Sequence, residues 1–268
     1  VEADLKIATG LVEPHFMAGF SGGRKVVAPG VAHEDTIRTF HNARFIEDRS
    51  SVQCNLTGNP LHEEQMEIIR MLGDVYALNT VVDEARNLSF INFGEIGASH
   101  LAAVRFLEAF CTVTLERRFK TVVTSAAGHP LDQTYYQTVK GMVMPMDILE
   151  MPATLIVASS CSEGLGSYAF RASQRRLIAN GPERFLQEIM PQQFAEIDEW
   201  QSEMQLRSQR IANVQLFTDG LDIEDRALTG VNLIDSVEDA VKASVAATGD
   251  PAVAIIPEGP YVVPVYAR

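Results

Sequence analysis

The sequence of 268 residues has few residues that could cross-link the chain and no segment that could anchor it in a membrane. Its three cysteines, Cys54, Cys111 and Cys161, show no paired spacing, which argues for a reducing compartment and against a structural zinc site. No apolar stretch approaches the roughly 20 residues that a transmembrane helix requires. We therefore expect a cytoplasmic protein without a membrane partner.

Positive charge is also scarce. Lysine and arginine total 22 against 35 aspartate and glutamate residues, which gives a net charge of −13. Such a surface repels the phosphates of nucleic acids and the head groups of anionic lipids. The charge balance therefore argues against a nucleic-acid partner.

What the sequence does contain is an alternation of short apolar runs with helical patterns. The runs that indicate buried strands are 4–10, 74–82, 88–94, 120–126, 153–160, 213–218 and 252–257. The helical patterns are 34–44, 62–72, 98–114, 132–143, 183–190, 194–212 and 236–247. This alternation predicts an α/β protein with two α/β domains and largely parallel sheets.

The charged segment Glu116–Lys120 follows a long apolar helix and marks the expected domain boundary. We expect a first domain over residues 1–117 and a second over 118–249. The stretch IPEGPYVVPV (256–265) in the closing segment 250–268 contains three prolines, which prevent it from pairing throughout as a central strand. We expect it to run along the surface as an extended tail that packs back on the first domain.

The segment GFSGGRK, residues 19–25, combines glycines with two basic residues. Glycines let backbone N–H groups converge, and the basic side chains would complete an anion site. The spacing does not match a phosphate-binding Walker loop. The alternative is a flexible turn with solvated basic side chains. His15 precedes this segment just after a strand, at the end where open α/β sheets gather their active-site loops.

Histidines occur at further positions along the first domain. Ile37 and His41 are four residues apart, which places the imidazole on the buried side of a helix. There it is either a neutral side chain bonded to a carbonyl or a metal ligand. His33 is a polar residue at the start of the same helix, and His62 and His100 are expected at surface or cap positions.

A second group of polar residues follows the strand at 120–126. Tyr136 and Lys140 are four residues apart with Gln137 beside them, so one helix presents a phenol, an amide and an ammonium group. These groups could hold a small carboxylate, or they could form the solvated side of an amphipathic helix. The glycine-rich loop 159–167 follows the next strand and either contacts a ligand or turns the chain.

Taken together, these segments resemble the lactate racemase family of nickel-dependent 2-hydroxyacid racemases and epimerases. The resemblance rests on PHFMAGFSGGRK (14–25), the helix with His41, YYQTVKG (135–141) and DEWQ (198–201), in the family's order and spacing. It covers essentially the whole chain. It implies an active site in the cleft between the two domains.

The resemblance also implies a tethered cofactor, a nickel pincer nucleotide whose pyridinium ring carries a thioamide and a thiocarboxylate arm. Lys25 would hold it covalently, and His41 would be the protein ligand of the nickel. Sulfur donors and imidazole suit Ni(II) in a planar arrangement. Trp200 would line the cofactor pocket. The implied partners are a small 2-hydroxy acid and the enzymes that make the cofactor.

The reaction that the resemblance implies is a reversible hydride transfer through a transient 2-keto acid. His15 would be one of two acid/base groups. Gln137 and Lys140 would orient the substrate carboxylate, and Tyr136 would shape the pocket.

The sequence departs from the family at its start. The second catalytic histidine and an Asp-x-x-Arg segment precede the signature in the family and are absent from this chain. Because Val1 is not a methionine and a strand begins almost at once, we expect an incomplete first domain and little activity from this chain alone. Two alternatives remain open: a metal-dependent hydrolase that uses His15 and His41, and a non-catalytic protein that binds a carboxylate or another anion.

Overall fold

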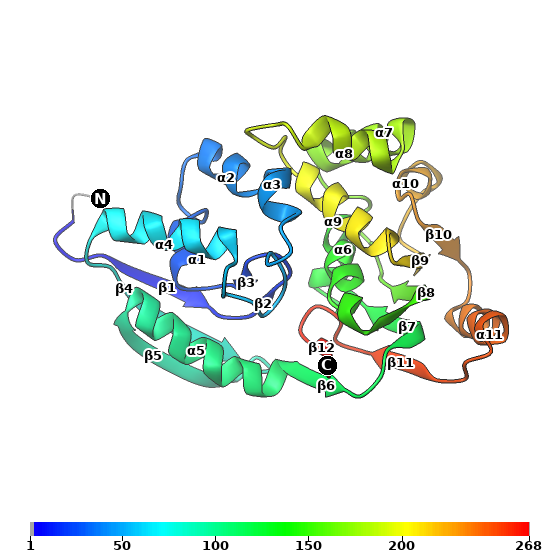
Figure 1. The fold of residues 1–268 in the computed structure, drawn as a ribbon, viewed down its shortest axis with the longest axis horizontal. Helices are drawn as coiled ribbons and strands as arrows, with labels where there is room; N and C mark the ends of the chain where they lie inside the picture. The colour runs from blue at the N-terminus through cyan, green and yellow to red at the C-terminus, as the bar shows by residue number, and fades with distance from the viewer. Residues whose placement is uncertain (1–2, 268) are drawn as a thin grey trace. The chain divides into compact units, whose positions relative to one another are not determined.

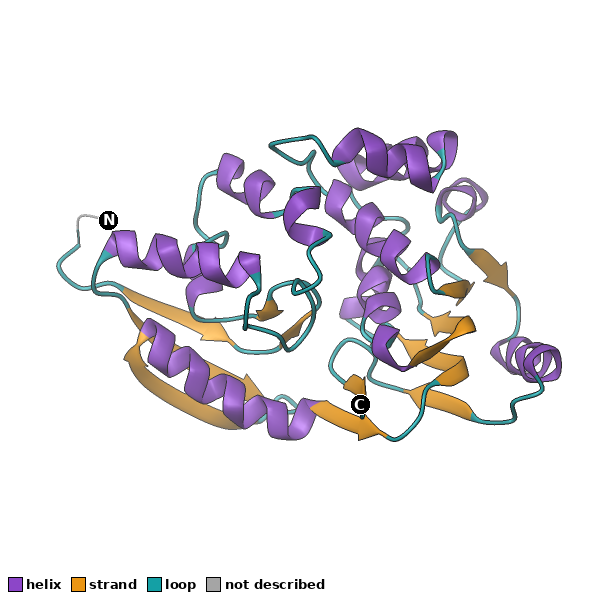
Figure 2. Cartoon of the chain, in the orientation of Figure 1, coloured by secondary structure: helices purple, strands orange, loops and turns teal. Residues whose placement is uncertain are grey.

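The computed structural model describes residues 3–267, which divide into two compact units, Val1–Thr112 and Val113–Arg268 (Figure 1). Both units combine strands with helices, as the alternating sequence patterns predict (Figure 2). The fold is therefore α/β. Within the described residues, no helix has the length and apolar character needed to traverse a bilayer.

The first unit is built on a three-stranded sheet in the order β1 (Ile7–Leu11), β4 (Tyr76–Val82) and β5 (Leu88–Glu95). β1 and β4 are parallel, but β5 runs antiparallel to β4. This pair is an exception within sheets that are otherwise largely parallel, as expected. The connection between them, residues 83–87, is too short for the crossover that parallel strands require.

The long connection from β1 to β4 carries most of the small elements of this unit. They are β2 (Pro14–His15), β3 (Gly19–Phe20), α1 (Arg24–Val27), α2 (Glu34–Phe40), α3 (Ala43–Ile46) and α4 (Pro60–Leu72). The Asn59 side chain caps α4 by accepting from the amides of Leu61 and His62, and Pro60 starts the helix. The expected single helix over 34–44 is interrupted at His41 and Asn42, where Asn42 caps α3.

Helices cover one face of this sheet. After β5 the chain enters α5 (Ile96–Cys111), whose apolar side packs with Val81, Val12 and Phe20. Ile69 of α4 packs with Ala8 and Ala77 from the same face of the strands. The other face carries exposed apolar side chains, namely Ile7, Tyr76, Leu88, Ile91 and Phe93.

The second unit contains a five-stranded sheet in the order β10-β9-β8-β7-β11, and all four strand pairs are parallel. The strands are β7 (Phe119–Ser125), β8 (Leu149–Ala158), β9 (Ala212–Phe217), β10 (Asn232–Ile234) and β11 (Val253–Ile256). The helices are α6 (Tyr135–Val143), α7 (Tyr168–Asn180), α8 (Pro182–Ile189), α9 (Glu199–Gln209), α10 (Ile223–Leu228) and α11 (Val237–Thr248), with 3-10 turns at Leu131–Gln133 and Met146–Ile148.

The C-terminal segment differs from the expected surface tail. β11 is an edge strand of the second unit's sheet, and β12 (Val263–Tyr266) pairs with β6 (Thr112–Leu115). The segment is assigned to the second unit. β11 pairs with one edge of β7, whereas β8, β9 and β10 extend the sheet from its other edge. The strand order therefore reverses at β7. Open α/β sheets bind ligands at such a point, beyond the carboxyl ends of the strands.

Candidate functional site

The segment GFSGGRK forms the end of a hairpin and the start of α1 in the first unit. Pro14 and His15 pair with Phe20 and Gly19 across the β2–β3 hairpin. Gly23 has a φ of 48°, and its amide donates to Asn79 Oδ1 of β4 at 3.0 Å. A Cβ on Gly23 would lie 2.6 Å from the His100 side chain, so the backbone needs a glycine to approach α5 this closely. The segment is a fixed loop rather than a flexible turn.

Arg24 is buried, with 1% of its surface exposed, which excludes the solvated state considered from the sequence. Its Nη2 donates to Ala18 O at 2.8 Å and its Nη1 donates to Phe20 O at 3.1 Å. Nη1 also lies 2.9 Å from His100 Nε2. The same nitrogen lies 2.9 Å from the carbonyl of Ser21, so His100 Nε2 accepts from Arg24 in one tautomer and donates to Ser21 in the other. The guanidinium group thus ties the hairpin to α5.

His15 lies on β2 and is half-buried, with its ring stacked on Phe16 at a centroid distance of 4.9 Å. Its Nδ1 accepts from the backbone amides of Ala18 at 3.1 Å and Met17 at 3.4 Å. With two donors directed at Nδ1, the proton of the neutral ring is on Nε2. His15 therefore presents an N–H group at its outer nitrogen.

His41 has the opposite tautomer. It ends α2, and its Nδ1 donates to the carbonyl of Ile37 at 2.7 Å, so the lone pair is on Nε2. This is the carbonyl-bonded state that the sequence left open, and it is also the arrangement in which metal-binding histidines are commonly held. Lys25, half-buried, follows Arg24 in α1.

The second unit holds the other predicted side chains. Tyr136, Gln137 and Lys140 lie on α6, which follows β7. Trp200 Nε1 on α9 donates to the hydroxyl of Tyr136 at 3.0 Å. Burial, reinforced by the charge of Asp198, raises the pKa of Tyr136 above its usual value, which keeps the phenol neutral. Gln137 Oε1 is buried and has no hydrogen-bond partner among residues 3–267.

The glycine-rich loop 159–167 caps α6. The carbonyls of Gly164 and Leu165 accept from the amides of Tyr135 and Tyr136, both at 3.0 Å. The loop is held in turn by Asp225, whose carboxylate accepts from the amide of Leu165 at 3.0 Å. Because the loop's carbonyls satisfy the first amides of α6, the loop fixes the start of the helix that carries the polar side chains.

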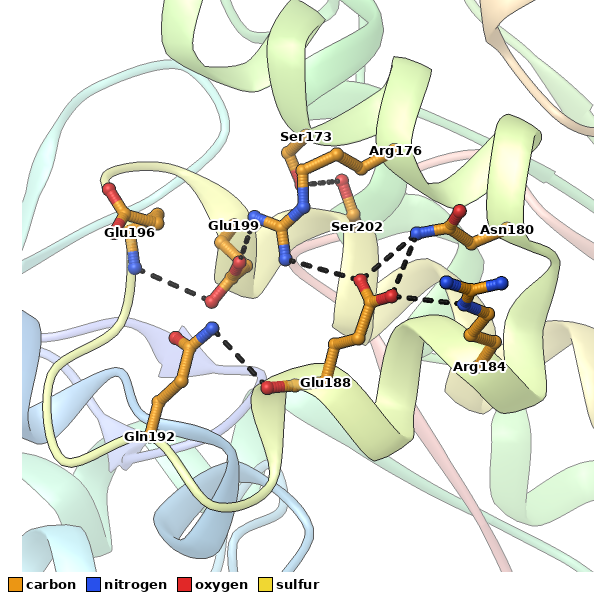
Figure 3. Close-up of polar contacts among 9 residues, drawn as sticks. All are labelled: Ser173, Arg176, Asn180, Arg184, Glu188, Gln192, Glu196, Glu199 and Ser202. Atoms are coloured by element: carbon orange, nitrogen blue, oxygen red, sulfur yellow. Dashed lines mark hydrogen bonds and ion pairs between the residues drawn. The ribbon is translucent and has the colours of Figure 1, made fainter.

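Polar contacts hold the first turn of α9, the helix that carries Trp200 (Figure 3). The neighbouring carboxylate of Glu199 accepts from Arg176 Nη1 at 2.7 Å, and Arg176 also approaches Glu188. Burial is the main influence on Glu199 and raises its pKa, although the cation of Arg176 opposes this. The first turn of α9 is thereby attached to α7 and α8.

The structure places the seven predicted residues in two groups, three in the first unit and four in the second. In the second group, a direct hydrogen bond joins Tyr136 to Trp200. The sequence interpretation placed Arg24 in an anion site or in solvent, and it assigned no role to His100. His100, 1% exposed, is not at a surface or cap position. Its spacing from Ile96, Val104 and Leu107 already placed it on the apolar side of α5.

Comparisons with known proteins agree with this arrangement of segments. Residues 1–53 match the lactate racemase N-terminal domain, and residues 116–264 match the lactate racemase C-terminal domain. A lactate racemase from Thermoanaerobacterium thermosaccharolyticum is 35% identical over 170 residues, which are 63% of this chain and 40% of that protein. One from Lactiplantibacillus plantarum is 29% identical over 261 residues, 96% of this chain and 61% of that protein.

Solved structures agree in fold. The lactate racemase apoprotein from T. thermosaccharolyticum superposes with a TM-score of 0.90 at 28% identity, covering 98% of this chain and 63% of that one. A Thermotoga maritima protein shares the fold, with a TM-score of 0.72 at 14% identity, covering 99% of this chain and 67% of that one. The chain thus spans less than two thirds of the length of both lactate racemases. It belongs to the lactate racemase family.

Proposed function

We propose that this protein racemises or epimerises a 2-hydroxy acid of the lactate type by reversible hydride transfer with a nickel pincer nucleotide tethered to Lys25. The named relatives are lactate racemases, and both family domains match this chain. The structural observation that carries the proposal is the hydrogen bond from His41 Nδ1 to Ile37 O. This hydrogen bond leaves the lone pair of Nε2 for a metal, and it fixes the orientation of the imidazole that would bind the metal.

The residues present fit such a cofactor. Lys25 follows a loop held by the sheet and by Arg24, so its backbone is fixed while its amine remains on a long side chain. His41 supplies one imidazole nitrogen, a ligand that suits Ni(II) alongside sulfur donors. When bound, the cofactor would supply a pyridinium ring that can accept and return a hydride. The enzymes that make the cofactor would be this protein's partners in the cytoplasm.

The chain's own side chains would handle the substrate and its proton. His15 holds a proton on Nε2, which we assign to donation toward the oxygen of the 2-keto acid as hydride returns to the adjacent carbon. Lys140 and Gln137 would bind the substrate carboxylate, one as a cation and one as an amide donor. Trp200 fixes the hydroxyl of Tyr136, so this pair would form a rigid wall of the pocket.

The test is mass spectrometry and metal analysis of the protein expressed with the cofactor-making enzymes. We expect a mass increase localised to Lys25 together with bound nickel. Lys25→Ala should lose both, whereas His41→Ala should keep the adduct and lose nickel. His33→Ala is the matched control, because His33 is an exposed residue at the other end of α2. An unmodified Lys25 in the wild type would contradict the proposal, and full nickel in His41→Ala would remove His41 as the ligand.

The same experiment separates the alternatives. A hydrolase with a metal on His15 and His41 would bind metal without an adduct at Lys25. It would also have two protein ligands where catalytic zinc sites commonly have three. A carboxylate-binding protein would bind lactate with neither nickel nor adduct.

A further inference from the structure

The buried guanidinium of Arg24 has no carboxylate partner among the described residues. Its contacts are the carbonyls of Ala18 and Phe20 and the imidazole of His100. Burial alone lowers its pKa from 12.5 to about 9, which reflects how unfavourable a charge is at this position. A buried charge without an ion-pair partner is costly, so its position calls for a role beyond packing.

Arg24 acts on the same short turn that sets the ring of His15. The carbonyl of Ala18 accepts from Arg24 Nη2, and the amide of Ala18 donates to His15 Nδ1. The hydrogen bond from Arg24 to the carbonyl of Ala18 therefore fixes this residue so that its N–H, like that of Met17, points at the imidazole of His15. These two donors favour the tautomer of His15 with its proton on Nε2.

His100 supports Arg24 from α5. Its ring lies against Gly23, where a Cβ would be only 2.6 Å away, and its Nε2 lies 2.9 Å from Arg24 Nη1. The same nitrogen is 2.9 Å from the carbonyl of Ser21. The backbone on the N-terminal side of Lys25 is thereby enclosed between the hairpin and α5.

We propose that Arg24 is a positioning residue that holds His15 as a neutral imidazole with its proton on Nε2, while fixing the backbone that carries Lys25. In this state His15 donates a hydrogen bond from Nε2 to the carbonyl oxygen of the 2-keto acid that the proposed reaction forms. Negative charge that develops on that oxygen is stabilised by the N–H, and the charge drawn onto the ring is stabilised by the two amides at Nδ1. A neutral imidazole held by backbone amides is an established way to polarise a carbonyl group.

The assignments of His15 to proton donation and Lys25 to the tether rest on the proposed function. The tautomer of His15 and the action of Arg24 do not, and they can be measured in the 268-residue chain without cofactor.

The experiment is a long-range ¹H–¹⁵N spectrum of the chain labelled at histidine nitrogens, with His15→Gln used to assign the signals. We expect His15 to show an unprotonated Nδ1 and a protonated Nε2. Arg24→Lys keeps the charge but cannot reach both carbonyls, so we expect loss of this single tautomer and appearance of the Nδ1–H form. Arg105→Lys, at an exposed arginine of α5, should leave the spectrum unchanged.

A wild-type spectrum with the proton of His15 on Nδ1 overturns the proposal. This measurement needs no variant, so it decides the tautomer even if Arg24→Lys does not fold, and Arg24→Gln then serves as the second variant. A wild-type tautomer in either folded Arg24 variant also overturns it. The proposed function fails on a different result. In that case Lys25 of the wild-type protein carries no adduct, although His15 has the expected tautomer.

Discussion

The contact between His100 and Arg24 predicts how the stability of the first unit depends on pH. Burial, then the charge of Arg24, lowers the pKa of His100 from 6.5 to about 3. The unfolded chain therefore binds a proton at His100 near pH 6.5, whereas the folded chain does not until about pH 3. Because the unfolded state binds more protons in this interval, stability is at its full value above pH 6.5 and falls as the pH is lowered.

The magnitude follows from the interval between the two pKa values. Each pH unit below the unfolded pKa costs about 1.4 kcal/mol for one proton that the folded state cannot bind. Between pH 7 and about pH 4.5, His100 should thus remove about 2 to 3 kcal/mol of unfolding free energy. His62 shifts in the same direction, to a pKa of about 4, and would add to this loss.

The assay is urea unfolding at both pH values, followed by hydrogen exchange of peptides from α5. Trp200 is the only tryptophan and lies in the second unit, so its fluorescence does not report on the first. The control is His100→Gln, whose amide can still face Arg24 but does not titrate. We expect a smaller loss of stability at low pH in the variant. Parallel pH curves for the two proteins would refute this account of His100.

Two further substitutions test the packing around the candidate site. Gly23→Ala should destabilise the first unit by about 3 kcal/mol in urea unfolding, because a positive φ is combined with a clash against His100. Gly73→Ala is its control, with a positive φ but open space around the Cβ, and should cost only about 1 kcal/mol; equal effects would show that the clash is unimportant. Tyr135→Phe should cost about 1 to 2 kcal/mol by Trp200 fluorescence, since the buried hydroxyl lies 2.8 Å from Thr229 O, and an unchanged midpoint would contradict that hydrogen bond.

The sequence predicted four of the five strands of the second unit's sheet, and β10 was missed. Its strands are continuous apolar or β-branched runs, as expected when helices cover a parallel sheet, and β7, β8, β9 and β11 all fall within or beside the predicted ranges. The prolines near the C-terminus led to the prediction of a surface tail. The four residues of β11 precede most of these prolines, and they are enough to form an edge strand. Local composition did not reveal which sheet that strand joins.

α7 could not be recognised from an apolar period, because its contacts with α9 are polar. Ser173 Oγ lies 2.8 Å from Ser202 Oγ, and Gln174 donates to Gln205 at 2.9 Å. Hydrophobic periodicity identifies helices whose buried side chains are apolar, and two of the four buried residues of α7, Ser173 and Gln174, are polar. The predicted start of α9 was also wrong. Asp198 adopts a left-handed conformation, which separates the helix from the preceding loop.

The candidate site was predictable where side-chain chemistry follows a motif and not where it depends on tertiary contacts. The helical position of His41 left both a carbonyl-bonded and a metal-binding state open, and its hydrogen bond to Ile37 is compatible with both. The environment of Arg24 was not readable from GFSGGRK, because α5, which contacts it, lies more than seventy residues away in the chain.

The connection between β1 and β4 contains His15, Lys25 and His41, and it begins and ends on adjacent strands of one sheet. The strand register, from Ile7 opposite Tyr76 to Leu11 opposite Thr80, therefore holds both ends of the connection together whatever lies between them. Insertions or substitutions in this connection can alter the reactive groups without shifting the register. Selection can thus adjust chemistry and scaffold separately in the first unit.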